Sequence, residues 1–173
     1  VGALDVCALP GDGGMNTRQM LAAADVAEID LLILMGADEL PMLQIGDTTY
    51  VIYIGSHGDA GAHRADIILP AAAYTEKSVT YVNTEGRPQM TMRAAFPPGE
   101  AREDWSILRA LSQQLDVTQP WNSITELRAA MYRIAPHLAA IDKLMPADAA
   151  MLQELGQGEG EWSGKGFASP IKD

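Results

Sequence analysis

The chain has 173 residues, a length typical of one domain or of one domain with a short appendage. Because 47% of its residues are hydrophobic and 20% are charged, the composition excludes a disordered tail, a collagen-like chain and a coiled coil. Lys and Arg total 12 against 23 Asp and Glu, and the formal net charge of −11 disfavours nucleic acid as a partner. The longest nearly uncharged run, residues 46–56, is far shorter than the roughly 20 residues that a membrane-spanning helix needs.

Cys7 is the only cysteine, which excludes an internal disulfide and an iron–sulfur cluster, since a cluster needs about four thiolate ligands. Its apolar neighbours Val6 and Ala8 predict a buried small side chain rather than a reactive thiol. The sequence starts at Val1 and shows no signal or transit peptide, so we expect a fragment or a processed chain.

Three apolar runs in the first half predict the strands of a parallel sheet. Residues 30–35 and 49–54 are each followed by glycine, and their nearly continuous apolar character is typical of strands buried on both faces. Residues 66–69 form a third run that stops at Pro70, which cannot donate to a ladder. Strands alternating with helical patterns indicate crossover connections.

Helical patterns flank these strands and dominate the later part of the chain. The stretch between residues 10 and 30 carries apolar side chains at helical spacing, with Asn16 or Thr17 as the cap. Two more helices are predicted after the Pro-Pro-Gly turn, and the second begins at Ser123, where Glu126 completes a capping box.

We therefore predict an α/β fold: a Rossmann-like, mostly parallel sheet with flanking helices, followed by an extended loop and a helical C-terminal part. Residues 1–75 are assigned to the Rossmann-like part, and residues 76–145 to the loop and helices of the same domain. Residues 146–173 are assigned to a short helix and a glycine-rich tail.

Two segments invite a chemical interpretation. Residues 11–14, Gly-Asp-Gly-Gly, match neither the dinucleotide fingerprint nor a P-loop, so a structural turn is expected. Residues 57–66 concentrate two of the three histidines and two carboxylates just after a predicted strand, where open α/β sheets bind ligands. One hypothesis is a metal hydrolase that uses these four side chains: His57, Asp59, His63 and Asp66. Their spacing matches no common metal motif, and capping aspartates explain the composition equally well.

Glu76 and Glu85 lie in a turn-rich stretch, where each has a basic neighbour within two residues. One of them could act as a general acid, but charges on such a loop are more often solvated or locally paired, here with Lys77 and Arg87.

Residues 53–70, 73–77, 81–87 and 97–105 together make the sequence similar to a known family. They closely resemble the large iron–sulfur subunit of respiratory complex I, the NADH:quinone oxidoreductase. Through residues 65–70, Glu76 and the later loop, the sequence also resembles the wider molybdopterin oxidoreductase superfamily.

The resemblance implies a non-catalytic structural segment of the peripheral arm of complex I, which supports NADH-to-quinone electron transfer by packing against the cluster-bearing portion. Its partners would be other complex I subunits and the N-terminal portion of the same subunit, where the iron–sulfur clusters are expected. No cofactor, nucleic acid or membrane insertion is expected for this segment. The expected location is the cytoplasmic side of a bacterial inner membrane or the mitochondrial matrix side. The alternative is a fragment of an active, formate dehydrogenase-like molybdopterin enzyme.

The resemblance also marks two groups of residues, none of them assigned to catalysis, cofactor or metal. The loop from Asn83 through Glu85 and Gly86 to Arg87 is expected to be architectural, with Gly86 at positive φ and the side chains of Asn83 and Glu85 accepting from backbone amides. The superfamily's pterin-nucleotide contacts map loosely onto two loops after the strands, which we expect to be vestigial: Gly36, Asp38, Gly55, His57 and Asp59.

Overall fold

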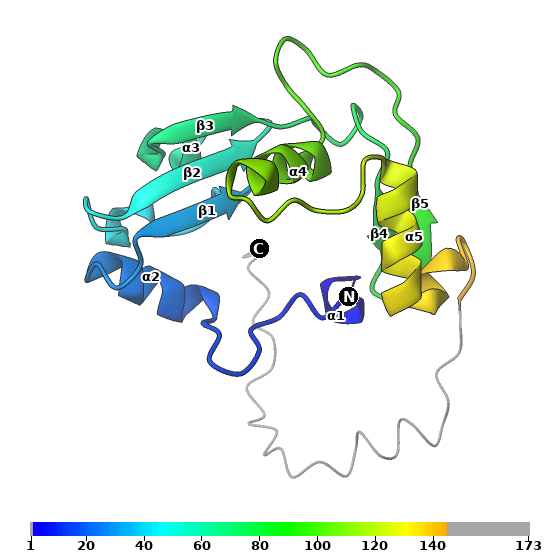
Figure 1. Cartoon of the computed structure of the whole chain (residues 1–173), viewed down its shortest axis with the longest axis horizontal. Coiled ribbons are helices and arrows are strands. Elements are labelled where there is room, and N and C mark those ends of the chain that lie inside the picture. Colours follow the sequence, from blue (N-terminus) through cyan, green and yellow to red (C-terminus); the bar gives the residue numbers. More distant parts are fainter. Residues whose placement is uncertain (1, 145–173) are drawn as a thin grey trace, which may run out of the picture.

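The structure is a computed structural model that describes residues 2–144. Its centre is a parallel sheet of three strands in the order β1 (Leu31–Met35), β2 (Tyr50–Gly55) and β3 (Ile67–Pro70). The register is regular, with Ile33 beside Ile52 and Ile52 beside Ile67. Figure 1 shows this sheet on one side of the molecule, with helices around it. The predicted α/β fold with a parallel sheet is confirmed.

Helices cover the two faces of the sheet. On one face, α2 (Thr17–Asp25) packs beside η1 (Met42–Gln44) and contributes Leu21 and Ala24 to a core with Leu34 and Tyr53. The helix begins at Asn16, whose side chain and that of Gln19 form a reciprocal capping box. α3 (Ala60–Arg64) belongs to the same layer.

The other face is covered by α4 (Asp104–Gln114). Its Ile107 and Leu108 pack against Ile52 and Ile54 of β2. A backbone hydrogen bond from Arg102 N to Pro70 O (3.1 Å) holds the residues before this helix beside the end of β3.

β1 lies where its sequence predicts, but its burial differs from the prediction. Leu32 and Leu34 are buried, whereas Leu31, Ile33 and Met35 are 45%, 38% and 47% exposed. The expectation that β1 is buried on both faces is therefore wrong for the described residues 2–144. The reason is that α4 packs over β2 and β3 and leaves the outer strand uncovered.

A second part of the molecule follows the sheet (Figure 1). It contains the antiparallel hairpin of β4 (Thr80–Val82) and β5 (Pro88–Met90), helix α5 (Ile124–Ile134) and the short η2 (Pro136–Ala139). Arg128 of α5 donates to the carbonyl of Ser78 at 3.2 Å, and Lys77 forms an ion pair with Asp104 of α4. These contacts connect the hairpin to both helices.

The predicted capping box of α5 is only half formed. Ser123 Oγ accepts from Glu126 N at 3.2 Å, as expected, but the Glu126 carboxylate accepts from Asn122 N at 2.7 Å rather than from the amide of Ser123.

Near the N-terminus, α1 (Gly2–Asp5) is followed by a turn, and the prediction that Cys7 is buried is wrong. Cys7 is exposed with φ +55° because the apolar stretch turns here instead of entering the core, and its amide donates to Leu4 O at 3.0 Å. The turn expected at residues 11–14 is present, with Gly13 at φ +77°. The predicted tail, residues 146–173, lies outside the described residues. Within residues 2–144, no helix has the length and apolar character to cross a bilayer.

Candidate functional site

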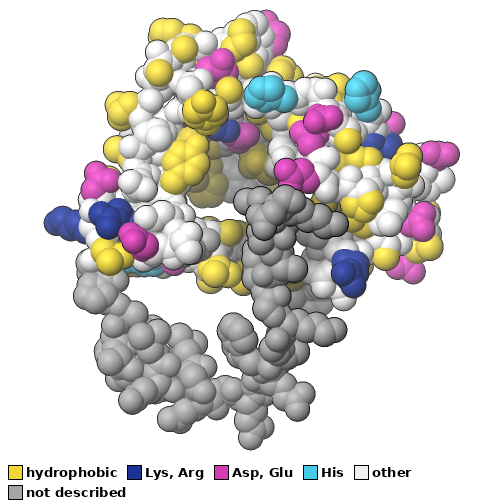
Figure 2. Space-filling model, turned by 180° about the vertical axis from the view of Figure 1, so that it is seen from behind, with side chains coloured by type: hydrophobic (Ala, Val, Ile, Leu, Met, Phe, Trp, Pro, Cys, Tyr) yellow, Lys and Arg dark blue, Asp and Glu magenta, His cyan; other side chains and the backbone are white. Residues whose placement is uncertain are grey.

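The two loops singled out from the sequence lie next to each other at the carboxyl edge of the sheet. Gly36 follows β1 with φ +58°, and its amide donates to Ile54 O at 2.8 Å, which ties the first loop to β2. His57 and Asp59 are exposed in the second loop. Figure 2 shows two histidine side chains on the upper part of the rear face, with acidic side chains beside them. The structure therefore brings together the five residues of the two loops.

A tyrosine joins these loops from within the sheet. The Tyr53 hydroxyl lies 2.6 Å from Asp38 Oδ2 and 2.9 Å from the carbonyl oxygen of His57, so its one proton has two acceptors. The other carboxylate oxygen of Asp38 accepts from Gly61 N at 2.9 Å. Asp38 thus connects the loop after β1 to β2 and to the first turn of α3, and both its oxygens have partners.

Two glycines make room for the ring of Tyr53. A Cβ atom added at Gly55 would collide with the Tyr53 hydroxyl and ring. One added at Gly61 would lie 2.8 Å from the ring and 3.0 Å from Ala37 O. The aromatic ring therefore occupies the space between the two loops, and only glycine at these two positions permits it.

Burial raises the pKa of Tyr53 to about 12, and the hydrogen bond to Asp38 and the charges of Asp38 and Asp59 act in the same direction. The hydroxyl is therefore protonated at neutral pH. In this state it serves as a hydrogen-bond donor to Asp38, and it is unsuited to act as a base or nucleophile.

These loops do not fit a pterin nucleotide, the group that the superfamily resemblance suggests for this edge. A pyrophosphate is negatively charged, so basic side chains favour its binding and nearby carboxylates repel it. Residues 36–39 and 55–59 contain the acidic Asp38, Glu39 and Asp59 and no Lys or Arg. The Asp38 carboxylate is also already engaged by Tyr53 and Gly61.

The four candidate ligands of the metal-hydrolase hypothesis do not form one site. His57 and Asp59 lie beyond the carboxyl end of β2, whereas Asp66 accepts from Val51 N at 2.7 Å at the amino end. Five strand steps separate these ends, about 16 Å. In the part of the chain that the structure describes, residues 2–144, no three His, Cys, Asp or Glu side chains are grouped to hold a metal ion.

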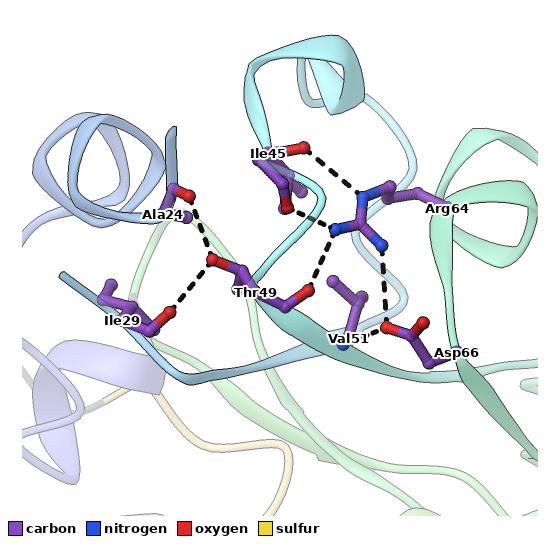
Figure 3. A network of polar contacts seen from close by, with 8 residues as sticks. Ala24, Ile29, Ile45, Thr49, Val51, Arg64 and Asp66 are labelled. Atoms are coloured by element: carbon purple, nitrogen blue, oxygen red, sulfur yellow. Dashed lines mark hydrogen bonds and ion pairs between the residues drawn. The ribbon is translucent and has the colours of Figure 1, made fainter. Parts of the chain in front are cut away.

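At the amino edge, Asp66 belongs to a different network, shown in Figure 3. Arg64 Nη2 donates to Gly46 O at 2.6 Å and to Thr49 O at 2.9 Å, and Arg64 Nη1 lies 3.6 Å from Asp66 Oδ2. The Thr49 hydroxyl lies 2.9 Å from the carbonyl oxygens of both Ala24 and Ile29. The network joins α2, the segment before β2, α3 and the start of β3.

The second group of predicted residues forms the tip of the β4–β5 hairpin. Gly86 has φ +81°, as expected, and Asn83 Oδ1 accepts from Glu85 N at 3.0 Å and from Arg87 N at 2.9 Å. The Glu85 carboxylate lies 3.3 Å from the Arg87 guanidinium, so its expected role as an acceptor for backbone amides is wrong, whereas the predicted ion pair is confirmed.

The pairing predicted for Glu76 and Lys77 is not observed. Lys77 reaches Asp104 instead, and the Glu76 carboxylate accepts from Ala73 N at 2.9 Å. Glu76 thus closes the turn after β3.

Sequence reasoning missed the roles of Tyr53, Thr49 and Arg64. The sequence predicts Tyr53 only as a core or interface anchor. The signal that could have revealed its role is a pair of glycines that follow it, Gly55 at the end of β2 and Gly61 in α3. Thr49 is the polar start of a buried strand, and such a buried hydroxyl needs partners.

Comparison with known proteins identifies the family. Residues 1–114 match the molybdopterin oxidoreductase family. The chain is 48% identical over 135 residues to the mitochondrial NADH-ubiquinone oxidoreductase 78 kDa subunit of Candida albicans, covering 78% of this chain and 18% of that protein. It is 42% identical over 144 residues to the NADH-ubiquinone oxidoreductase 75 kDa subunit of Reclinomonas americana, which covers 83% of this chain and 20% of that protein.

Among solved structures, acetylene hydratase from Pelobacter acetylenicus aligns with a TM-score of 0.56 at 17% identity, over 75% of this chain and 19% of that chain, which supports the fold alone. The chain spans about one fifth of the length of the curated relatives it matches. The relatives confirm the resemblance to the large subunit of complex I, and the chain belongs to the molybdopterin oxidoreductase family.

Proposed function

We propose that this chain is a non-catalytic structural segment of the large subunit of respiratory complex I and that it supports NADH-to-quinone electron transfer through assembly. The observation that carries the proposal is the identity of 40–48% to NADH-ubiquinone oxidoreductase subunits over 78–83% of the chain. The oxidoreductase activity that those names state is an activity of the relatives. The proposal for this chain concerns its contribution to assembly of the complex.

The carboxyl edge of the sheet supports a non-catalytic role. Ligands of open α/β sheets bind in the crevice at this edge. Here the ring of Tyr53 fills the space between the loops, and its protonated hydroxyl is bonded to Asp38. The chain's own side chains thus occupy the place that a ligand would need.

The two segments that flank the hairpin, one before β4 and one after β5, support a role in protein contacts. Tyr74, Met92 and Phe96 are 73%, 75% and 78% exposed, and the Arg93 guanidinium lies 4.3 Å from the centre of the Phe96 ring. Ala94 N donates to Thr75 O at 2.9 Å, which holds the two exposed stretches together. Aromatic residues, Met and Arg are the types enriched at protein interfaces. We infer that this loop packs against other complex I subunits or against the N-terminal portion of the same subunit.

Cofactor content and location follow the same proposal. The iron–sulfur clusters belong to the N-terminal portion of the subunit, and this segment holds none, since Cys7 alone cannot ligate one. The relatives from Candida albicans and Solanum tuberosum are mitochondrial proteins. We place the segment in the peripheral arm, on the matrix side in mitochondria or the cytoplasmic side in bacteria.

The test is to introduce Phe96→Asp into the full-length subunit and to quantify assembled complex and NADH:quinone turnover per assembled complex. We expect less assembled complex and normal turnover in what assembles. Gln44→Asp, a change at an exposed polar side chain of η1, is the control and should leave assembly at the parent level. Normal assembly with a large loss of turnover would contradict the proposal. Molybdenum bound to the purified subunit and lost on Asp38→Ala would favour the molybdopterin-enzyme alternative.

A further inference from the structure

One face of the parallel sheet is apolar and only partly covered. Leu31, Ile33 and Met35 of β1 point to the side that α4 covers, because they pair with Tyr50, Ile52 and Ile54, and Ile52 and Ile54 contact α4. We call these three β1 side chains the β1 face. Each is more than one-third exposed, although their partners Ile52 and Ile54 are buried.

The sequence of β1 is suited to burial on both sides. Leu-Leu-Ile-Leu-Met has no polar residue on either face, whereas a strand with one solvated face normally alternates apolar and polar side chains. Within residues 2–144, β1 pairs with β2 alone, so its other backbone edge has no strand partner there. Both features indicate a surface that another element covers.

The position of α4 defines the shape of the space beside it. α4 packs against Ile52 and Ile54 of β2, and Leu69 of β3 belongs to the same apolar cluster, which contains no β1 residue, so α4 lies on the β2–β3 side of this face. Neighbouring strands are about 4.8 Å apart and packed helices about 8–10 Å apart. A second helix packed against α4 on this face would therefore lie over β1 and its free edge.

We propose that the β1 face is the docking surface for an amphipathic helix that belongs to the same subunit, in the part of that polypeptide outside this chain. The inference rests on the proposed function. In the matched relatives, the part that corresponds to this chain is about one fifth of a longer polypeptide. A helix on the same polypeptide has a high effective concentration at this face. Parallel sheets are normally covered by helices on both faces. The apolar stripe of the proposed amphipathic helix would complement the β1 face, which carries no charge.

Thiol labelling tests the proposal. Met35→Cys is introduced, with Cys7→Ser, into the 173-residue chain and into the full-length subunit. Maleimide labelling of that position is followed by peptide mass spectrometry in the chain, in the free subunit and in the assembled complex. Ile33→Cys repeats the test at a second position, Gln44→Cys is the control at an exposed polar side chain outside the β1 face, and circular dichroism checks that each variant is folded.

We expect rapid labelling of the Met35→Cys thiol in the 173-residue chain and labelling at least about tenfold slower in the free full-length subunit. The Gln44→Cys thiol should label equally fast in both. Rapid labelling in the free subunit overturns the inference. This holds even if the assembled complex protects the site, because another subunit would then cover the β1 face. Slow labelling already in the 173-residue chain overturns it as well, since the chain would cover its own face. Protection in a free subunit that never enters complex I would uphold this inference and contradict the proposed function.

Discussion

Removal of the Tyr53 hydroxyl tests the interpretation of the carboxyl edge. The side chain is 1% exposed, and its hydroxyl donates to the Asp38 carboxylate at 2.6 Å. Tyr53→Phe keeps the ring but leaves one oxygen of Asp38 without this donor. A hydrogen bond to a charged group contributes about 1.5–3 kcal/mol, so we expect the free energy of unfolding to fall by about that amount at neutral pH.

The same hydroxyl gives the effect a characteristic pH dependence. The pKa of Tyr53 is raised from 10.0 to about 12, so its contribution is fully present below the unfolded value and is lost as the pH rises through the folded value. A shift of this size corresponds to about 3 kcal/mol. The difference in stability between the parent and Tyr53→Phe should therefore be constant up to about pH 10 and should shrink between about pH 10 and 12.

Urea unfolding of the 173-residue chain, followed by circular dichroism from neutral pH to alkaline pH, measures this difference. Tyr50→Phe is the matched control, because Tyr50 starts the same strand with a half-exposed ring on the opposite face. It should change stability by less than about 0.5 kcal/mol. A Tyr53→Phe cost as small as the control's, or a cost that stays constant through alkaline pH, would refute the role assigned to the Tyr53–Asp38 pair.

Three further changes are predicted to lower the free energy of unfolding in the same urea assay. Gly86→Ala should cost about 1–3 kcal/mol because Gly86 has φ +81°, while Gly58→Ala, at a glycine with open space around it, should be nearly neutral. Arg64→Met should cost at least about 2 kcal/mol, since it removes the donor to three carbonyls and the partner of Asp66. Thr49→Val, which keeps the shape and removes the hydroxyl, should cost about 1–2 kcal/mol. Costs near zero for the last two would show that the network in Figure 3 adds little to stability.

The positions of the sheet strands could be predicted because their signals are local. Apolar runs bounded by glycine or proline mark all three, and the observed strands begin within one residue of the predicted ones. Asn16 could be recognised as a helix cap for the same reason, since the capping box involves residues three apart. Gly86 belongs to this class too, because a tight hairpin turn favours positive φ.

Contacts between distant residues could not be predicted from such signals. The Asp38 carboxylate meets Tyr53 and Gly61, which are 15 and 23 residues away, and no local pattern encodes these distances. Arg64 likewise reaches carbonyls 15 and 18 residues away. The metal-hydrolase hypothesis was wrong for this reason: closeness in sequence suggested one site, whereas strand β2 separates Asp66 from His57.

The error about β1 differs in kind, because there the sequence pattern and the chain's own structure disagree. An apolar strand whose outward side chains are half exposed carries more hydrophobic surface than the described residues can cover. At the other end of the same strands, Tyr53 and Asp38 already fill the space that open α/β sheets offer to small ligands. Among the described residues, large exposed apolar side chains include those of the β1 face and of the loop around Phe96. This distribution favours contacts with other protein elements over binding of a small molecule, which is the arrangement expected of a segment that contributes to a redox complex through assembly.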